Sequence, residues 1–351
     1  MRLGEVLRST TQYQRLVEAL QRGESLPGLG MARAARLPLV ASLSRDIRQP
    51  ILLVTDRPGR ALTFMDEMGF WDQEIRKLLF PEPGPLFYEQ AAWGNSVRRD
   101  RLQALTSLAA YHLPNADQPK TPPVIITTAQ ALMTRTLPRR DLIKNARQVN
   151  VGQVIAPEVL IRQWSEVGYQ PAEVVLEPGQ FSRRGGILDV WPPAEKLPVR
   201  LDFFGNEVDT LRIFDPASQR TVSKLDRILI TPAREYLPGY AARLNLNVPP
   251  EEMGEFYLPV IHPTPASIID YIPKGSLVLI EDLDALESAV TEIEEQAVKF
   301  REESIREGLL GEDFPIPYLS WSELQDSLYG RLVLELGYSS AEEPSELAQL
   351  F

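Results

Sequence analysis

One glycine-rich stretch lies where a phosphate-binding loop could form. Residues 28–36 read GLGMARAAR and lead into a segment with helical spacing of apolar residues. A phosphate loop needs glycines that turn backbone amides inward, a lysine for the β- and γ-phosphates, and a hydroxyl for Mg²⁺. Gly28 and Gly30 supply glycines, but no Gly-Lys-Ser or Gly-Lys-Thr follows. Arg33 stands where a dinucleotide-binding loop has its third glycine, so the loop is incomplete for either nucleotide class.

Two adjacent carboxylates could serve the same chemistry. Glu281 and Asp282 directly follow the apolar run 277–280, and acidic residues at the end of a buried strand can hold the magnesium ion of a nucleotide. Without a lysine and a hydroxyl elsewhere, these acids have no nucleotide to serve, which favours a structural role. The two histidines, His112 and His262, are far apart in sequence, and cysteine is absent. We therefore expect no catalytic residue and no metal site.

A third stretch is suited to binding a partner. Residues 180–191 read QFSRRGGILDVW, which places Arg183 and Arg184 directly before two glycines and a short apolar run. A guanidinium is a planar fork of donors that matches a carboxylate. Glycine lets the backbone turn without a Cβ penalty, so the arginines can project from the edge of a strand. The alternative is a solvated strand edge whose charges only discourage aggregation.

The charge of the chain is unevenly distributed. The net charge is −11, but 18 acidic and four basic residues lie from Glu281 onward, which leaves 33 basic and 30 acidic residues before it. This balance argues against DNA binding by the whole chain. Residues 181–234 contain nine basic and seven acidic residues, a patch that fits an acidic protein better than a phosphate backbone.

The sequence also bears on localisation. No run approaches the roughly 18 apolar residues of a membrane span, and the first residues lack a signal-peptide pattern. The absence of cysteine fits a reducing compartment. We expect a cytoplasmic protein with no membrane contact.

Helical and strand-like segments alternate at both ends of the chain. Residues 31–47 have apolar side chains at helical spacing, and the apolar runs 51–54 and 124–128 are typical of strands buried in a parallel sheet. The same alternation occurs near the other end of the chain, where the apolar run 277–280 precedes residues 283–308, which have apolar side chains at helical spacing. This alternation predicts a parallel sheet with helices on its faces.

The middle of the chain has a different rhythm. Five short segments, from residues 173–176 to residues 225–230, alternate apolar and polar side chains. Gly205-Asn206 between two of them is a good hairpin turn, since both residues tolerate positive φ. Close strands with tight turns predict an antiparallel sheet inserted into a discontinuous α/β domain. The expected domains are residues 1–145, residues 146–233 and residues 234–351, the last with an acidic end.

A longer pattern connects these features to a known family. Residues 181–193 read FSRRGGILDVWPP, residues 198–209 read PVRLDFFGNEVD, and residues 212–216 read RIFDP. The pattern resembles the bacterial transcription-repair coupling factors, the Mfd family, whose N-terminal region is itself similar to the excision-repair helicase UvrB. Shorter matches such as residues 254–260 (GEFYLPV) extend the resemblance over nearly the whole chain, and it is strongest in residues 149–232.

The resemblance implies a fold. It is an α/β fold with a degenerate helicase-like (RecA-like) parallel-sheet domain, discontinuous in sequence, and an inserted β-rich α+β domain. The repair helicase has a working phosphate loop, whereas the coupling factor's is degraded. Gly28, Gly30 and Arg33 are accordingly assigned to a vestigial nucleotide loop.

The resemblance also implies that the β-rich domain docks on the repair protein UvrA. The arginine before the glycines in the family's UvrA-binding set matches Arg184. Two other basic positions of that set fall on Ser182 and around Gln170-Pro171, and Arg183 can substitute for one of them. The assigned partner-binding residues are Arg184, Arg183 and Phe181, and the residues of the turn are Gly185 and Gly186.

The function implied is that of an adaptor. The chain looks like an N-terminal fragment that recruits UvrA to RNA polymerase stalled at DNA damage, without cofactor or catalysis of its own. The parent's other parts would bind RNA polymerase and DNA and release the polymerase by ATP-driven translocation with ATP and Mg²⁺. The alternative is a nucleotide-hydrolysing fragment of a UvrB-like excision-repair helicase. Direct recognition of damaged DNA is a third hypothesis, which the acidic end disfavours.

Overall fold

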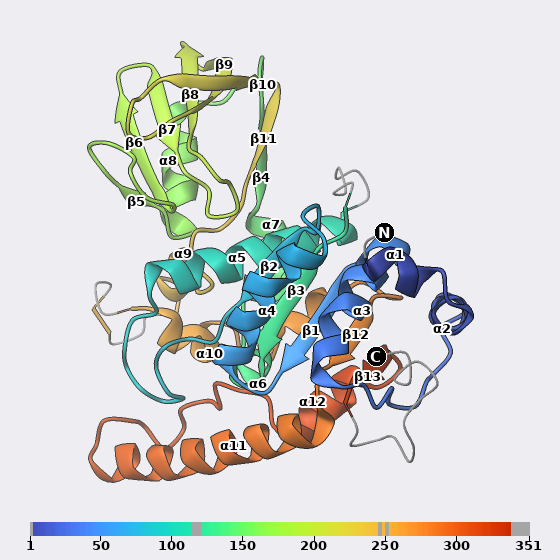
Figure 1. Cartoon of the computed structure of the whole chain (residues 1–351). Helices are drawn as coiled ribbons and strands as arrows, with labels where there is room; N and C mark the ends of the chain where they lie inside the picture. The colour runs from blue at the N-terminus through green and yellow to red at the C-terminus, as the bar shows by residue number, and fades with distance from the viewer. Residues whose placement is uncertain (1–2, 114–120, 245–247, 250–252, 338–351) are drawn as a thin grey trace. The chain divides into compact units, whose positions relative to one another are not determined.

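The computed structural model describes residues 3–113, 121–244, 248–249 and 253–337 (Figure 1). The chain forms two compact units. Unit 1 contains residues 1–89, 110–135 and 267–351, and unit 2 contains residues 90–109 and 136–266. Each unit is therefore discontinuous in sequence.

Unit 1 is built on a five-stranded parallel sheet. The strand order is β13-β12-β1-β3-β2. The strands are β1 (Ile51–Thr55), β2 (Lys77–Phe80), β3 (Val124–Thr128), β12 (Leu277–Ile280) and β13 (Leu332–Glu335). Every residue of β1, β3 and β12 is buried, because both faces of a parallel sheet are covered. The α/β fold with a parallel sheet expected from the sequence is confirmed.

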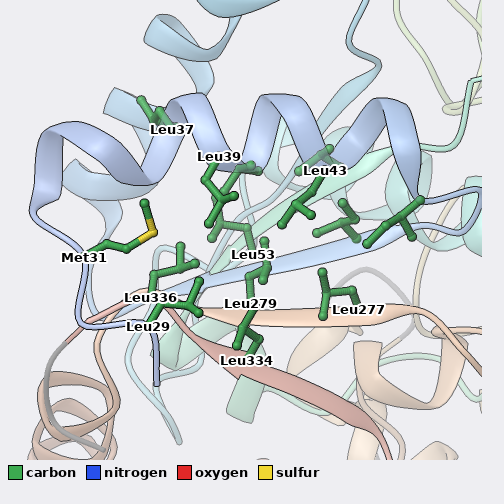
Figure 2. Close-up of a cluster of buried hydrophobic side chains, with 14 of the residues drawn as sticks. Leu29, Met31, Leu37, Leu39, Leu43, Leu53, Leu277, Leu279, Leu334 and Leu336 are labelled. Atoms are coloured by element: carbon green, nitrogen blue, oxygen red, sulfur yellow. The ribbon is translucent and has the colours of Figure 1, made fainter. Parts of the chain in front are cut away.

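Seven helices of the described part of unit 1 surround this sheet. They are α1 (Leu3–Arg8), α2 (Thr11–Gln21), α3 (Arg33–Asp46), α4 (Pro58–Trp71), α6 (Ala129–Met133), α11 (Leu283–Arg306) and α12 (Trp321–Leu328), with the 3₁₀ turns η1 (Ala110–His112) and η3 (Ile268–Tyr271). Figure 2 shows Leu39 and Leu43 of α3 lying over Leu53 of β1 and Leu279 of β12. Burying each such leucine contributes about 1.5–3 kcal/mol, so α3 is fixed on the sheet.

Unit 2 contains a six-stranded sheet in the order β10-β9-β8-β7-β6-β5 and a two-stranded sheet of β11 and β4. Only β5 and β6 pair in parallel within the larger sheet. The strands are β4 (Arg147–Asn150), β5 (Gln170–Pro171), β6 (Gln180–Arg184), β7 (Ile187–Val190), β8 (Val199–Phe204), β9 (Glu207–Phe214), β10 (Thr221–Leu225) and β11 (Arg227–Ile230). Its helices are α5 (Asn95–Ala109), α7 (Arg139–Asn145), α8 (Pro157–Glu166), α9 (Pro238–Ala241) and α10 (Leu258–Ile261), with the 3₁₀ turn η2 (Glu255–Tyr257).

Two local expectations for the β-rich region can be compared with unit 2. The hairpin at Gly205-Asn206 is confirmed, since Phe204 pairs with Glu207 and Gly205 has φ of 60°. The strand expected at residues 173–176 is wrong, because these residues form a loop. Their alternating side chains follow the loop's own packing, in which Val175 alone is fully buried.

A buried ion pair explains why unit 2 extends beyond the β-rich segment. Arg101 of α5 and Glu235, which follows β11, are both almost completely buried, and Arg101 Nε donates to Glu235 Oε1 at 2.5 Å. The Arg101 guanidinium also stacks on the Trp93 ring at 4.8 Å. The compact unit therefore includes α5 and residues 234–266. The expected boundaries at 146 and 233, as limits of separate domains, stay a prediction.

We expect Glu235→Ala to destabilise unit 2 by about 3–5 kcal/mol, because it leaves a buried guanidinium without its carboxylate. The measurement is urea unfolding followed by tryptophan fluorescence, to which Trp93 contributes. Glu24→Ala, which removes the exposed partner of Arg22, should change the free energy of unfolding by less than about 0.5 kcal/mol. A loss below about 1 kcal/mol for Glu235→Ala would contradict the assigned weight of this pair.

Candidate partner-binding site and nucleotide loop

The two glycines of the RRGG stretch form the turn between β6 and β7. Arg184 pairs with Ile187, so Gly185 and Gly186 are a two-residue hairpin loop. Gly185 has φ of 59°, in the left-handed region that primed hairpin turns require. A Cβ on Gly186 would lie 3.1 Å from the Phe203 carbonyl oxygen, so the close approach of β8 favours glycine at this position. The structure thus gives each glycine its own physical reason.

A buried carboxylate orients the guanidinium of Arg184. Asp189 has 1% side-chain exposure, and its Oδ2 accepts from Arg184 Nη2 at 2.8 Å. Arg200 donates to both oxygens of the same carboxylate, at 2.7 and 2.8 Å. Hydrogen bonding to Asp189 raises the pKa of Arg200. The side chain of Arg184 remains 47% exposed and uses one donor in this ion pair, which leaves others directed to solvent.

Arg183 lies on the opposite face of the strand. Its guanidinium donates to Glu158 Oε1 at 2.6 Å, in the first turn of α8, and both side chains are exposed. The Glu158 backbone N–H and the Arg183 guanidinium hold the pKa of the Glu158 carboxyl below its usual range. Arg183 and Arg184 therefore do not form one continuous cationic pair, because adjacent residues of a strand point to opposite faces.

The structure corrects the assignment of Phe181 to partner contact. Its exposure is 5%, and its ring lies edge-on to Trp164 of α8 with centroids 6.0 Å apart. Phe181 is part of the core between helix and sheet, where a partner cannot reach it. Ser182 is also buried, and its Oγ donates to the Glu173 carbonyl at 2.8 Å. Gln170 and Pro171 are exposed on the edge strand β5.

The glycine-rich loop of unit 1 is closed by the sheet. The amides of Leu29, Gly30 and Met31 donate at 2.8–2.9 Å to the carbonyls of residues 335–337, at the end of β13. Figure 2 shows Leu29 and Met31 beside Leu336, within the hydrophobic core. Gly30 has φ of 62°, so a glycine is still needed here. The amides that would cradle a phosphate are instead part of a strand-like pairing.

A buried cluster occupies the end of β12. Arg36 of α3 lies 3.2 Å from Glu281 Oε1, Arg60 Nε donates to the same oxygen at 3.1 Å, and Thr55 Oγ1 donates to Oε2 at 2.9 Å. Burial lowers the pKa of the Arg36 guanidinium, and the Glu281 and Asp282 carboxylates oppose that shift. Four groups thus satisfy one another where a magnesium ion would need a free carboxylate.

The other residues of this region have local roles. Asp282 caps helix α11, since its Oδ1 accepts from the Ala285 amide at 3.1 Å. Arg33 is exposed at the start of α3, and Gly28 is buried. Of the two arginines in residues 28–36, Arg36 and not Arg33 contacts Glu281 at the strand end. Sequence analysis could not predict this contact, because the two residues are 245 positions apart.

Among the residues that the structure describes, no group of three or more histidine, aspartate or glutamate side chains could hold a metal ion. In the same residues, none of the helices combines the length and apolar character needed to cross a bilayer.

One protein family and several known proteins are similar to this chain. Residues 148–236 match the family described as the UvrB interaction domain. The chain is 25% identical over 351 residues to the transcription-repair-coupling factor of Bacillus subtilis, covering 89% of this chain and 29% of that protein. The Escherichia coli protein of the same name is 33% identical over 210 residues, covering 60% of this chain and 17% of that protein.

A second kind of relative is also similar. The UvrABC system protein B of Kosmotoga olearia is 26% identical over 239 residues, covering 64% of this chain and 34% of that protein. The chain thus spans about a third or less of the length of the relatives it matches. The resemblance expected from the sequence is confirmed: residues 148–236 match the UvrB interaction domain, and the chain is similar over most of its length to transcription-repair-coupling factors.

Proposed function

We propose that this chain is a non-catalytic adaptor that recruits UvrA to RNA polymerase stalled at DNA damage in the cytoplasm. The support is the match of residues 148–236 to the UvrB interaction domain, together with similarity to transcription-repair-coupling factors. RNA polymerase binding, DNA binding and ATP-driven release of the polymerase would belong to other parts of such a protein.

The observation that carries the proposal is the presentation of Arg184. A buried carboxylate, Asp189, fixes the direction of its guanidinium, and the side chain is still half exposed. A guanidinium held in this way loses little conformational entropy when it meets a partner, so its remaining donors can bind a carboxylate strongly. The same face carries Arg200 and Arg212, which are ion-paired with Asp189 and Asp202.

A second set of residues supports the part of the proposal that this chain does not bind a nucleotide. The amides of residues 29–31 are committed to residues 335–337, and Glu281 is committed to Arg36, Arg60 and Thr55. A nucleotide would have to break both sets of interactions and leave Arg36 buried without its carboxylate. Separating a buried ion pair in this way costs about 3–5 kcal/mol, which opposes binding.

The second candidate is a nucleotide-hydrolysing fragment of a UvrB-like excision-repair helicase. Similarity to a UvrABC system protein B and the parallel sheet of unit 1 favour it. It requires ATP binding at the loop of residues 28–36, which separates it from the adaptor function.

We expect Arg184→Ala to weaken binding to UvrA of the same organism by at least about 2 kcal/mol, roughly thirtyfold in Kd, because it removes an oriented guanidinium from an interface. Isothermal titration calorimetry with the purified chain measures this. Asp189 keeps both bonds from Arg200, so the fold should persist. Arg22→Ala is the matched control, since Arg22 is an exposed, ion-paired arginine of unit 1. Equal affinity of Arg184→Ala and wild type would remove Arg184 from the interface.

We expect Mg²⁺-ATP to leave the melting temperature of the chain unchanged, because a ligand raises stability only if it binds the folded state. Calorimetric titration of ATP, with and without Mg²⁺, should give no saturable heat. Saturable, magnesium-dependent binding would favour the helicase function over the adaptor.

A further inference from the structure

Two apolar side chains are exposed at one end of the six-stranded sheet of unit 2. Phe204 is 82% exposed at the end of β8, and Val154 is 75% exposed in the segment that follows β4. The hairpins β6–β7 and β8–β9 both turn at this end, which places Phe204 near the RRGG turn. Single exposed apolar residues are ordinary on protein surfaces, so their significance depends on their common placement.

The register of the strands puts Phe204 on the same face as Arg184. Arg184 pairs with Ile187, and Ile187 pairs with Asp202. Directly paired residues share a face, and Phe204 lies two residues beyond Asp202 on the same strand. At spacings of about 4.8 Å between strands and 3.3 Å per residue, the Cα atoms of Arg184 and Phe204 are roughly 12 Å apart.

Val154 extends the same face. Phe204 pairs with Glu207, and Glu207 forms a bridge with Val154, so the two apolar residues flank one carboxylate. The opposite face is the core, where Val208, the partner of Phe203, is completely buried. Phe204 is therefore turned outward by strand alternation and cannot be drawn into the core without a change of register.

Backbone hydrogen bonds fix the segments that carry these side chains. The amides of Gly152 and Ile155 donate to the carbonyls of Val208 and Asn206 at 2.8 and 2.7 Å, which fixes the segment of Val154 along β9. A bulge opposite Asp202 and Phe203 increases the twist of β9 at this point. A surface that is rigid before binding loses little entropy on binding.

The charges of the face identify the kind of partner. Two rows of paired residues cross this face. One runs from Arg184 to Thr210 of β9, and the other runs from Ser182 through Asp189 to Lys224 of β10. Their charged members are the cations Arg184, Arg200, Arg212 and Lys224 and the carboxylates Asp189 and Asp202. The two rows are net positive, and both arginine and aromatic side chains are enriched at protein interfaces.

We propose that Phe204 is the apolar anchor of the UvrA interface, with Val154 beside it and Arg184 as its charged contact. We name these residues, together with Ile187 and Glu207, the hairpin-tip surface. The inference rests on the proposed function and deepens it. The complementary surface of UvrA would hold an apolar pocket for the phenyl ring, a carboxylate opposite Arg184 and a basic group opposite Glu207.

The test measures binding of the full chain to UvrA of the same organism at low and high salt. Phe204→Ala should lower the affinity at least about tenfold with an unchanged melting temperature, because the side chain is exposed. Its matched control is Phe70→Ala, in helix α4 of unit 1, where the phenylalanine is 86% exposed; that variant should stay within twofold of wild type. The loss for Phe204→Ala should be equal at both salt concentrations, whereas that for Arg184→Ala should shrink at high salt.

The outcomes separate the two proposals. Failure of the wild-type chain to bind UvrA overturns the proposed function and the inference with it. Binding that Arg184→Ala weakens and Phe204→Ala leaves unchanged overturns the inference alone. Equal losses for Phe204→Ala and Phe70→Ala also overturn it, since they would show a general effect of removing exposed rings.

Discussion

The buried carboxylate of Asp189 is the interaction on which the open face of unit 2 depends. A charge that is removed from water must be paired and hydrogen-bonded, and Asp189 meets this condition with three bonds from Arg184 and Arg200. The pairing reaches across three adjacent strands, β6, β7 and β8. It therefore fixes the direction of two guanidiniums relative to one sheet, and Gln219 in the β9–β10 turn adds a further acceptor for Arg200.

Glu281 in unit 1 is also a buried carboxylate that must be paired, but one of its arginine partners is buried with it. It accepts from two arginines, of which Arg36 has 5% side-chain exposure, against 47% for Arg184. The pair in unit 1 is directed into the fold, beside a glycine-rich stretch whose amides are already bonded to β13. The two carboxylates thus differ in the exposure of one arginine partner, Arg36 in unit 1 and Arg184 in unit 2. The same chemistry gives unit 1 a buried contact and unit 2 a half-exposed guanidinium.

Local patterns predicted much of this molecule, and contacts between distant residues account for the rest. Apolar runs identified β1, β3 and β12, and the turn chemistry of Gly205 identified the β8–β9 hairpin. Strand alternation alone would also have predicted that Phe181 is buried, because it shares its face with apolar residues such as Val190. The same alternation predicts that either Phe203 or Phe204 is exposed, because two consecutive residues of a strand point to opposite faces. The membership of α5 in unit 2 was not predictable, since Arg101 and Glu235 are 134 residues apart.

The face that we propose for UvrA binding carries positive charge, although two of the family's basic positions are occupied by other residues. A charged side chain at position 182 would lose its hydration, because Ser182 is buried and its hydroxyl donates to the Glu173 carbonyl. Yet Ser182 belongs to a row of paired residues that continues through Asp189 and Arg200 to the next two strands, which add Arg212 and Lys224. The cations are therefore on the same face, displaced across the sheet by about two to four strand spacings, or roughly 10–20 Å. A partner that binds this face would contact cations over the middle of the sheet and over β10. At the RRGG turn it would contact Arg184, which matches a basic position of the family.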